Sequence, residues 1–524
     1  MDQPTEDKMS SQLSLAIPDR EAHDSGGRLS GLNWMALVGA AVLLAYLIYQ
    51  SLNGGQAPPP DDGHHGPPEG YQPPPLWACL PFAGLLLSIA LLPLIGATEH
   101  WWENNKNRLA VSLGFAAVSL LFYLLIHPLT YNHTTHEIYT TGADRVVQVL
   151  EHAILAEYIP FIVLLFSLYV ISGGISLRGD LIAKPSTNVT FLAVGAALAS
   201  FIGTTGASML LIRPLLQTNS ERRNVKHTVI FFIFLVSNVG GCLLPIGDPP
   251  LFLGYLMGVP FLWTFGLAVP WAVTCVLLLG IYFVWDTIAF KHEKEIDLIK
   301  DRLVREKLSL RGKINLLYLG GVVLCVALVK PGEPFPLLGF TTFPFLRELL
   351  MFGLVLASLK STSSQIRKDN QFNYHAIIEV AVLFVGIFIA MQIPIEILTA
   401  KGASLGLSEP WHFFWATGTL SAFLDNAPTY VVFFTTAEAM AHGSGAGMLE
   451  LAGGQHIAEK LLVGISLGAV FMGAMSYIGN GPNFMVKSIA EQSGIKMPSF
   501  FGFMAYSCVV LLPLFAVVTL LFLR

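Results

Sequence analysis

The composition of this 524-residue chain is that of a membrane protein. Hydrophobic residues make up 53% of the chain and charged residues only 12%, whereas soluble domains carry about 25% charged residues. A soluble enzyme and a nucleic-acid-binding protein are therefore excluded, and we expect an all-α polytopic protein whose main partner is the lipid bilayer. The formal net charge of −5 decides little, because the sidedness of Lys and Arg matters more than their sum.

No enzymatic signature accompanies this composition. The sequence contains no P-loop, nucleophile elbow, HExxH motif or dinucleotide fingerprint, so we expect no enzyme activity and no cofactor. The five cysteines stand in apolar segments without metal-ligand spacing, which predicts small buried hydrophobes and no disulfide. They are Cys79, Cys242, Cys275, Cys325 and Cys508.

Three segments precede the main apolar region. Residues 1–31 are polar and predict a disordered cytoplasmic tail, since no apolar stretch of a signal peptide follows the start. Residues 32–51 predict an extra transmembrane helix. Residues 52–75 are rich in Pro and Gly and contain no Lys or Arg, which is typical of an external linker.

Further along the chain, apolar runs recur near the roughly 20 residues that a bilayer crossing needs. In chain order they are 76–96, 109–129, 153–175, 188–217, 228–257, 261–289, 314–330, 347–359, 375–398, 411–440, 461–486 and 500–523.

Two of these runs, 188–217 and 411–440, are too long for one helix and have a polar break in the middle. Both flanks of the first run are basic and both flanks of the second are poor in Lys and Arg, so each run has both ends on one side. We therefore predict two re-entrant hairpins, one entering from the cytoplasm and one from outside. Two short full crossings in each run would give the same sidedness.

With these hairpins the chain divides into two halves of the same element order. Residues 76–290 form the first transporter repeat and residues 314–524 the second, inverted repeat, joined by a cytoplasmic linker at 291–313. The alternating charges of the linker predict a solvated helix on the membrane surface. The expected architecture is about 11 transmembrane helices plus two re-entrant hairpins and broken helices, a plan from which many secondary transporters are built.

Four polar breaks carry the predicted chemistry: 203–207 (GTTGA), 237–250 (SNVGGCLLPIGDPP), 425–429 (DNAPT) and 476–483 (SYIGNGPN). Broken helices leave backbone carbonyls and amides without intrahelical partners, and lipid cannot satisfy them. With hydroxyl and amide side chains they offer the hard oxygen ligands that Na⁺ accepts. The predicted ion or substrate ligands beside the two aspartates discussed next are Thr204, Thr205, Gly206, Ser237, Asn238, Gly247, Asn426, Thr429, Ser476, Asn480 and Asn483.

Asp248 and Asp425 are the sharpest features. A carboxylate in the bilayer interior costs at least about 2.5 kcal/mol, so it is a functional residue by default, binding a cation or carrying a proton. Capping of a half-helix, with Pro in the first turn, also fits both aspartates. We predict a Na⁺ site at Asp248, Asp425, Asn238 and Asn480.

Other charges within the apolar segments are less specific. Glu157 and Glu379 occupy matching positions in the two halves and are either proton relays or interface residues. Arg213, inside the first hairpin, either holds an anion or extends to the cytoplasmic surface. Asp286 lies near a segment end and is interpreted as a boundary residue.

The PIGDPP and SAFLDNAPT tracts, with the two halves, resemble the ion transporter superfamily of citrate and dicarboxylate carriers, arsenite permeases and NhaD-type sodium/proton antiporters. TEHWWENNK at 98–106 and IEVAVLFVGIFIAM at 378–391 are similar to a bacterial group named for citrate transport or sodium:proton antiport. The resemblance spans roughly 76–524. NhaD-like members match Asp248, Asp425 and Asn426, whereas the Ser-Asn-Thr tips common in carboxylate carriers are absent.

Residues and resemblance together predict a secondary transporter. Two aspartates without a central arginine suit a cation better than a tricarboxylate, which favours Na⁺/H⁺ antiport by alternating access, abolished by Asp425→Asn without unfolding. The alternative is Na⁺- or H⁺-coupled citrate or dicarboxylate symport, and a scaffold without transport would leave the aspartates unexplained. The resemblance implies a bacterial inner-membrane location and a homodimer, and the distribution of Lys and Arg predicts a cytoplasmic N-terminus.

Overall fold

The computed structural model describes seven stretches of the chain, and the tail, the extra helix and most of the external linker predicted for residues 1–71 lie outside them. The described residues belong to one compact unit, 65–524. They are 72–93, 95–128, 130–131, 138–303, 306–330, 342–441 and 447–524.

Helices dominate this unit, in agreement with the predicted all-α class. Six helical stretches are long and apolar enough to cross a membrane. They are Asn105–Leu125, Gly142–Ser172, Pro185–Ile202, Trp263–Lys291, His375–Lys401 and Phe500–Phe522.

The first half begins with η2 (Leu76–Cys79), α2 (Leu80–Leu91) and α3 (Glu99–Trp102), which precede the long helix α4 (Asn105–Leu125). A β-ribbon of β1 (Thr130–Tyr131) and β2 (Ile138–Tyr139) follows. The predicted third helix is longer than expected, because it consists of three continuous pieces. They are α5 (Gly142–Leu150), the π-helix η3 (Glu151–Tyr158) and α6 (Ile159–Ser172).

The predicted first hairpin consists of α7 (Pro185–Ile202) and α8 (Thr204–Thr218), which pack against each other. Gly203 alone separates them and has φ of 77°, a backbone conformation that glycine adopts without the penalty of a side chain. The break is therefore narrower than the expected 203–207, because Thr204 to Ala207 already form the first turn of α8.

The following segment is interrupted, as the sequence predicts. It consists of α9 (Lys226–Leu235), the short 3₁₀ turn η4 (Val239–Cys242) and α10 (Pro249–Leu256). Then come η5 (Trp263–Leu267) and α11 (Ala268–Lys291), which closes the first half.

The linker differs from the single surface helix expected for it. Its helical part is α12 (Glu295–Leu303), and β4 (Glu306–Arg311) pairs antiparallel with β3 (Ser176–Asp180). The reason is visible afterwards in Leu308 and Leu310, whose spacing of two is that of a strand. The ribbon fastens the linker to the segment that precedes the first hairpin.

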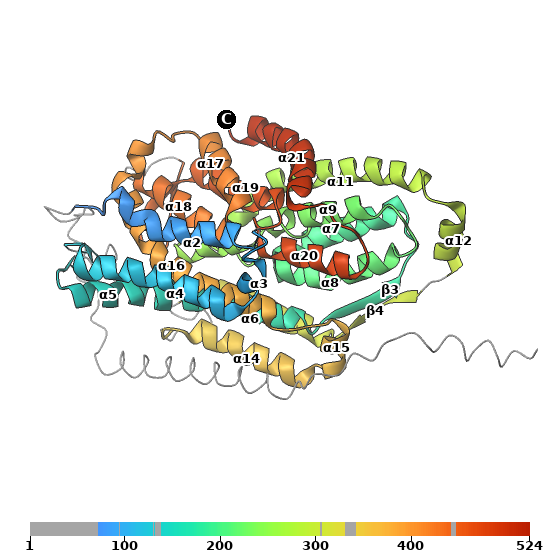
Figure 1. Cartoon of the computed structure of the whole chain (residues 1–524), viewed down its shortest axis with the longest axis horizontal. Coiled ribbons are helices and arrows are strands. Elements are labelled where there is room, and N and C mark those ends of the chain that lie inside the picture. The colour runs from blue at the N-terminus through green and yellow to red at the C-terminus, as the bar shows by residue number, and fades with distance from the viewer. Residues whose placement is uncertain are drawn as a thin grey trace, which may run out of the picture. The chain divides into compact units, whose positions relative to one another are not determined.

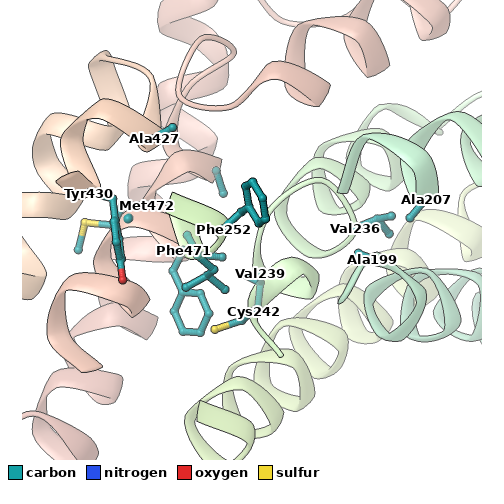
Figure 2. Packing of buried hydrophobic residues seen from close by; sticks show 14 of the residues in the cluster. Ala199, Ala207, Val236, Val239, Cys242, Phe252, Ala427, Tyr430, Phe471 and Met472 are labelled. Carbon is teal, nitrogen blue, oxygen red and sulfur yellow. The ribbon is translucent and has the colours of Figure 1, made fainter. Parts of the chain in front are cut away.

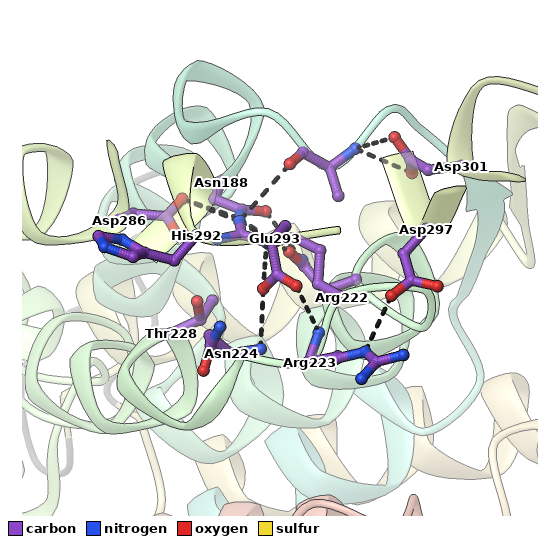
Figure 3. A network of polar contacts seen from close by, with 12 residues as sticks. Asn188, Arg222, Arg223, Asn224, Thr228, Asp286, His292, Glu293, Asp297 and Asp301 are labelled. Atoms are coloured by element: carbon purple, nitrogen blue, oxygen red, sulfur yellow. Dashed lines mark hydrogen bonds and ion pairs between the residues drawn. The ribbon is translucent and has the colours of Figure 1, made fainter. Parts of the chain in front are cut away.

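A second attachment is a buried polar network (Figure 3). It joins the start of α7 and the loop after α8 to the last part of α11. Arg222 donates to both carboxylate oxygens of Asp286, at 2.6 and 3.2 Å, and Asn188 and His227 also bind that carboxylate. Asp286 is completely buried, so its interpretation as a boundary residue is wrong. Glu293, just after α11, accepts from the backbone amides of Arg223 and Asn224.

The second half also contains a pair of packed helices and an interrupted segment. Its first members are α13 (Ile314–Leu328), α14 (Leu346–Ser361), the short α15 (Ser364–Asp369), the long α16 (His375–Lys401) and η6 (Gly402–Leu405). The predicted second hairpin is α17 (Pro410–Phe423) and α18 (Asn426–Ala439), followed by a ribbon of β5 (Met448–Glu450) and β6 (His456–Ala458). The second interrupted segment is α19 (Glu459–Met472), η7 (Gly473–Met475) and α20 (Gly481–Gln492), and α21 (Phe500–Phe522) ends the chain.

Segments from the two halves lie side by side throughout this unit. In Figure 1, α4 runs beside α16 and α20 beside α8, and α10 contacts α18. Gly254 of α10 permits the close contact between α10 and α18, because a Cβ at this position would lie 2.3 Å from the hydroxyl of Tyr430. Figure 2 shows apolar side chains of both hairpins and both interrupted segments in one buried cluster, which brings the four predicted breaks together.

Candidate functional site

The four breaks deliver four polar side chains to one point. Thr204 is the first residue of α8 and Asn426 the first residue of α18. Asp248 and Asn480 occupy the N-cap positions of α10 and α20. Each residue therefore stands where a half-helix begins, and the positive ends of those helices point toward the same region.

Asp248 is the centre of this arrangement. Its carboxylate is 1% exposed and accepts three hydrogen bonds from neutral side chains. The hydroxyl of Thr204 and the amide of Asn480 donate to Oδ1 at 3.0 and 2.8 Å, and the amide of Asn426 donates to Oδ2 at 2.7 Å. Two donors come from the second half of the chain, so the site forms only when the halves are packed together.

Asp248 makes no ion pair with any residue in the described stretches. A buried carboxylate that is neither paired nor bound to a cation carries a large desolvation cost, which hydrogen bonds offset only in part. The arrangement is therefore suited to taking up a proton or a metal cation at the carboxylate.

Two amide oxygens nearby have no hydrogen-bond partner. Oδ1 of Asn238 and Oδ1 of Asn426 are both buried and unsatisfied, although both side chains donate through Nδ2. Both amides border Gly473, where a Cβ would lie 2.9 Å from Asn238 Oδ1 and 3.6 Å from Asn426 Nδ2. Buried acceptors without partners are rare in folded proteins and call for an explanation such as an ion.

A second layer of amides fixes Asn238. Its Nδ2 donates to Oδ1 of Asn483 at 2.7 Å, and Asn483 in turn donates to the carbonyls of Gly473 and Ser476, both at 2.9 Å. Asn483 therefore uses backbone carbonyls freed by the helix break to hold the orientation of Asn238.

The two aspartates differ in their roles. Asp425 caps α18, because its Oδ1 accepts from the backbone amide of Ala427 at 3.0 Å. Asp248 also stands at an N-cap position, but its side chain makes no capping hydrogen bond and is held by the side chains described above. The capping interpretation thus applies to Asp425 and not to Asp248.

The other predicted ligands make no hydrogen bond to the Asp248 side chain among the described residues. The carbonyl of Ser237 accepts from Asn480 at 3.1 Å, and the carbonyl of Gly247 accepts from the amide of Thr204 at 2.8 Å. Gly206 packs on Ser172, and Thr205 is half-buried in the first turn of α8. The hydroxyls of Thr429 and Ser476 bind the carbonyls of Asp425 and Ala422.

Glu157, Glu379 and Arg213 are not among the side chains that bind Asp248. Glu157 accepts from Gln392 at 2.8 Å, and Glu379 pairs with Arg108 at 3.0 Å. Arg213 donates to Gln371 at 3.1 Å. Each glutamate also lies near a histidine, Glu157 near His152 at 3.6 Å and Glu379 near His375 at 4.0 Å, but only Glu379 pairs with an arginine among the described residues.

Some residues that shape the site were missing from the sequence prediction. Ser200, before the break at 203–207, holds the break at 237–250, because its hydroxyl donates to the carbonyl of Gly240 and accepts from the amide of Leu243. Ser421, before the break at 425–429, donates to the carbonyl of Ala469 at 2.8 Å. Both are single serines in apolar helices, and the only sequence signal was their distance of a few residues from a predicted break.

The fold and this site define a multi-pass helical membrane protein of the transporter class, in which interrupted helices meet at a buried carboxylate. A family described as "Putative citrate transport" matches residues 72–523, and the chain belongs to that family. The search of curated proteins gave no match.

Proposed function

We propose that the chain is a secondary active transporter in which Asp248 binds a monovalent cation and a proton in turn, with Na⁺/H⁺ antiport as the function that its site favours. The observation that carries this proposal is the buried Asp248 carboxylate, which neutral donors surround and no basic side chain of the described residues neutralises. A cation or a proton is the charge that this carboxylate lacks.

Na⁺ would be held by hard oxygen atoms. The Asp248 carboxylate and the unsatisfied Oδ1 atoms of Asn238 and Asn426 are available for this purpose. Since the amide of Asn426 now donates to Asp248, Na⁺ uptake would turn that amide so that oxygen, not nitrogen, faces the ion. A proton on Asp248 would exclude the same Na⁺, which gives one-for-one competition.

Alternating access would follow from the packing of the two halves. The hairpins and interrupted helices meet at Asp248 from both halves, so a displacement of one half relative to the other changes the ligand set around the carboxylate. We place the protein in the bacterial inner membrane with a cytoplasmic N-terminus, as a homodimer.

A second candidate is Na⁺- or H⁺-coupled symport of citrate or a dicarboxylate. The description of the family favours it. In this mechanism Asp248 would hold the coupling ion, and a separate group of basic side chains would bind the carboxylates.

The experiment that separates the two functions follows the internal pH of proteoliposomes when Na⁺ is added, first without and then with citrate. Na⁺-driven proton movement without citrate, absent in Asp248→Asn, supports antiport. Movement that requires citrate supports symport. If the intact protein moves no solute under either condition, transport is rejected and a scaffold role gains support.

A further inference from the structure

A cavity of about 620 Å³ lies at the far ends of the helices that carry the site. It is lined by residues of the last turns of α8 and α20, the start of α9 and the loops that follow α8 and α20. Its charged lining residues are all basic, and no Asp or Glu lines it. They are Arg213, Arg222, Arg223, Lys226 and Lys496.

Three of these charges are not neutralised. Arg222 is paired with Asp286, and Arg223 with Asp297. The other three cations, Arg213, Lys226 and Lys496, form no ion pair within the described stretches, and Arg213 donates only to the neutral side chain of Gln371. The cavity therefore carries an excess of about three positive charges.

Three helices connect this cavity to Asp248. α8 begins with Thr204 and α20 directly after Asn480, and both residues bind Asp248. α9 runs the other way, from Lys226 at the cavity to the break at Ser237. At a rise of 1.5 Å per residue, the nine residues from Thr204 to Arg213 span about 14 Å along α8.

The packing of these helices makes the connection direct. α8 and α20 run side by side in Figure 1, and α9 contacts α20. The cavity and the carboxylate are thus the two ends of one three-helix group, and a solute in the cavity is one helix length from the site.

A multivalent carboxylate is the ligand class that this lining recognises. Arg and Lys bind carboxylates by charge-assisted hydrogen bonds, and guanidinium groups do so with two parallel bonds. A cavity of 620 Å³ lies within the usual range of small-molecule sites.

We propose that this basic cavity is a receiving site for a citrate-like di- or tricarboxylate on its way to the interrupted helices. The inference deepens the carboxylate symport proposed above and rests on it for its transport role. The binding itself requires only the cavity, and it can be measured without transport.

The test uses the full chain in nanodiscs of pure phosphatidylcholine, with citrate affinity measured by calorimetry for the intact protein, Arg213→Gln and Lys496→Gln. We expect each variant to bind citrate at least tenfold more weakly, with acetate binding in none of them. Lys313→Gln is the matched control, because Lys313 is exposed, makes no ion pair with any other residue that the structure describes, and does not line the cavity. Its affinity should equal that of the intact protein.

Other results would overturn the proposal. These are the absence of citrate binding, equal affinity in all variants, or a lining that retains added phosphatidylglycerol but not citrate, which would make it a lipid headgroup site. Asp248→Asn separates the two proposals. This variant should still bind citrate in the cavity but no longer transport. If the intact protein exchanges cations but does not bind citrate, the cavity proposal is rejected and the antiport function is retained.

Discussion

Asn426 donates its side-chain amide to Asp248 at 2.7 Å across 178 residues of sequence. Both residues start a half-helix, one in each half of the chain, and both are buried. The contact therefore joins the second hairpin to the first interrupted segment at the carboxylate itself, and it responds to any displacement of one relative to the other.

Replacement of Asn426 by Ala should weaken both ion binding and the fold. It removes one donor to Asp248 and one unsatisfied oxygen, so we expect the Na⁺ concentration for half-maximal exchange to rise at least tenfold. The loss of a hydrogen bond to a buried charge costs about 1.5–3 kcal/mol of stability. Asn224→Ala, at an exposed amide, is the control, and equal Na⁺ dependence in both variants would contradict the prediction.

Two substitutions at Asp425 separate its cap from its charge. Asn is as good an N-cap as Asp, whereas Ala costs about 1 kcal/mol of helix stability. Asp425→Asn should therefore unfold at the same temperature as the intact protein but lose Na⁺/H⁺ exchange. Asp425→Ala should unfold at a lower temperature and also lose exchange. Thermal unfolding and vesicle pH measure the two effects, and full exchange in Asp425→Asn would limit this residue to capping.

Gly473→Ala should impair transport because of the position of its new methyl group. A Cβ there would lie 2.9 Å from Oδ1 of Asn238, so the amide must move. We expect at least a tenfold lower exchange rate in folded protein. Gly481→Ala is a matched change near Asn480, where a Cβ meets nothing within 4 Å, and it should leave the rate unchanged. Similar rates in the two variants would show that Asn238 does not contribute.

Asp180, at the end of β3 and outside the membrane-spanning helices, should make stability depend on pH. Burial, together with Glu221, Asp301 and Glu306, raises the pKa of Asp180 from 3.8 to about 6. The folded chain therefore binds more protons than the unfolded chain in this window. The contribution of Asp180 to stability is therefore most favourable below the unfolded pKa of 3.8 and falls as the pH rises to about 6, beyond which its penalty is constant.

Asp180→Asn removes this penalty. Its unfolding temperature should exceed that of the intact protein by a few degrees at neutral pH, and the difference should shrink at about pH 5. Glu295→Gln, at an exposed position of α12, provides the control for the loss of one negative charge. A difference that is independent of pH would refute the assignment to Asp180.

The buried pair of Arg222 and Asp286 should matter far more than its exposed neighbour. Removing one partner of a buried ion pair costs about 3–5 kcal/mol, and an exposed pair is worth about 0–1 kcal/mol. The side chains of Arg222 and Asp286 are 1% and 0% exposed, whereas that of Arg223 is 58% exposed. Arg222→Gln should unfold at a much lower temperature than Arg223→Gln, and equal losses would contradict this.

The sequence predicted the positions of the interruptions well, because lipid makes their cause local. Gly203, the Asp-Pro pair at 248–249 and the Asn and Pro residues at 426 and 428 contradict the apolar helices around them. Asp248 supplies the central carboxylate and Asn426 one of its three donors, and the other two, Thr204 and Asn480, also lie in predicted breaks. Their partners, in contrast, depend on how segments 178 or 232 residues apart pack.

The predictions that failed also concern packing between segments that are far apart in the sequence. Asp286 ends an apolar segment, which is normal for a charged residue, and only packing shows that Arg222 and His227 enclose it. The strand β4 contains enough charge to resemble a surface helix, and its pairing partner β3 stands more than 120 residues earlier in the chain. Contacts between remote segments leave no local pattern.

The dependence of the Asp248 site on both halves has a consequence for biosynthesis. Asp248 is synthesised and inserted before Asn426 and Asn480. During this interval its carboxylate lies in the bilayer without two of its three hydrogen-bond donors. A nascent chain that stops near residue 313 would hold a charged group with little to satisfy it. Such a fragment should be recognised and degraded unless the second half is co-expressed, which makes the site itself a checkpoint for complete assembly.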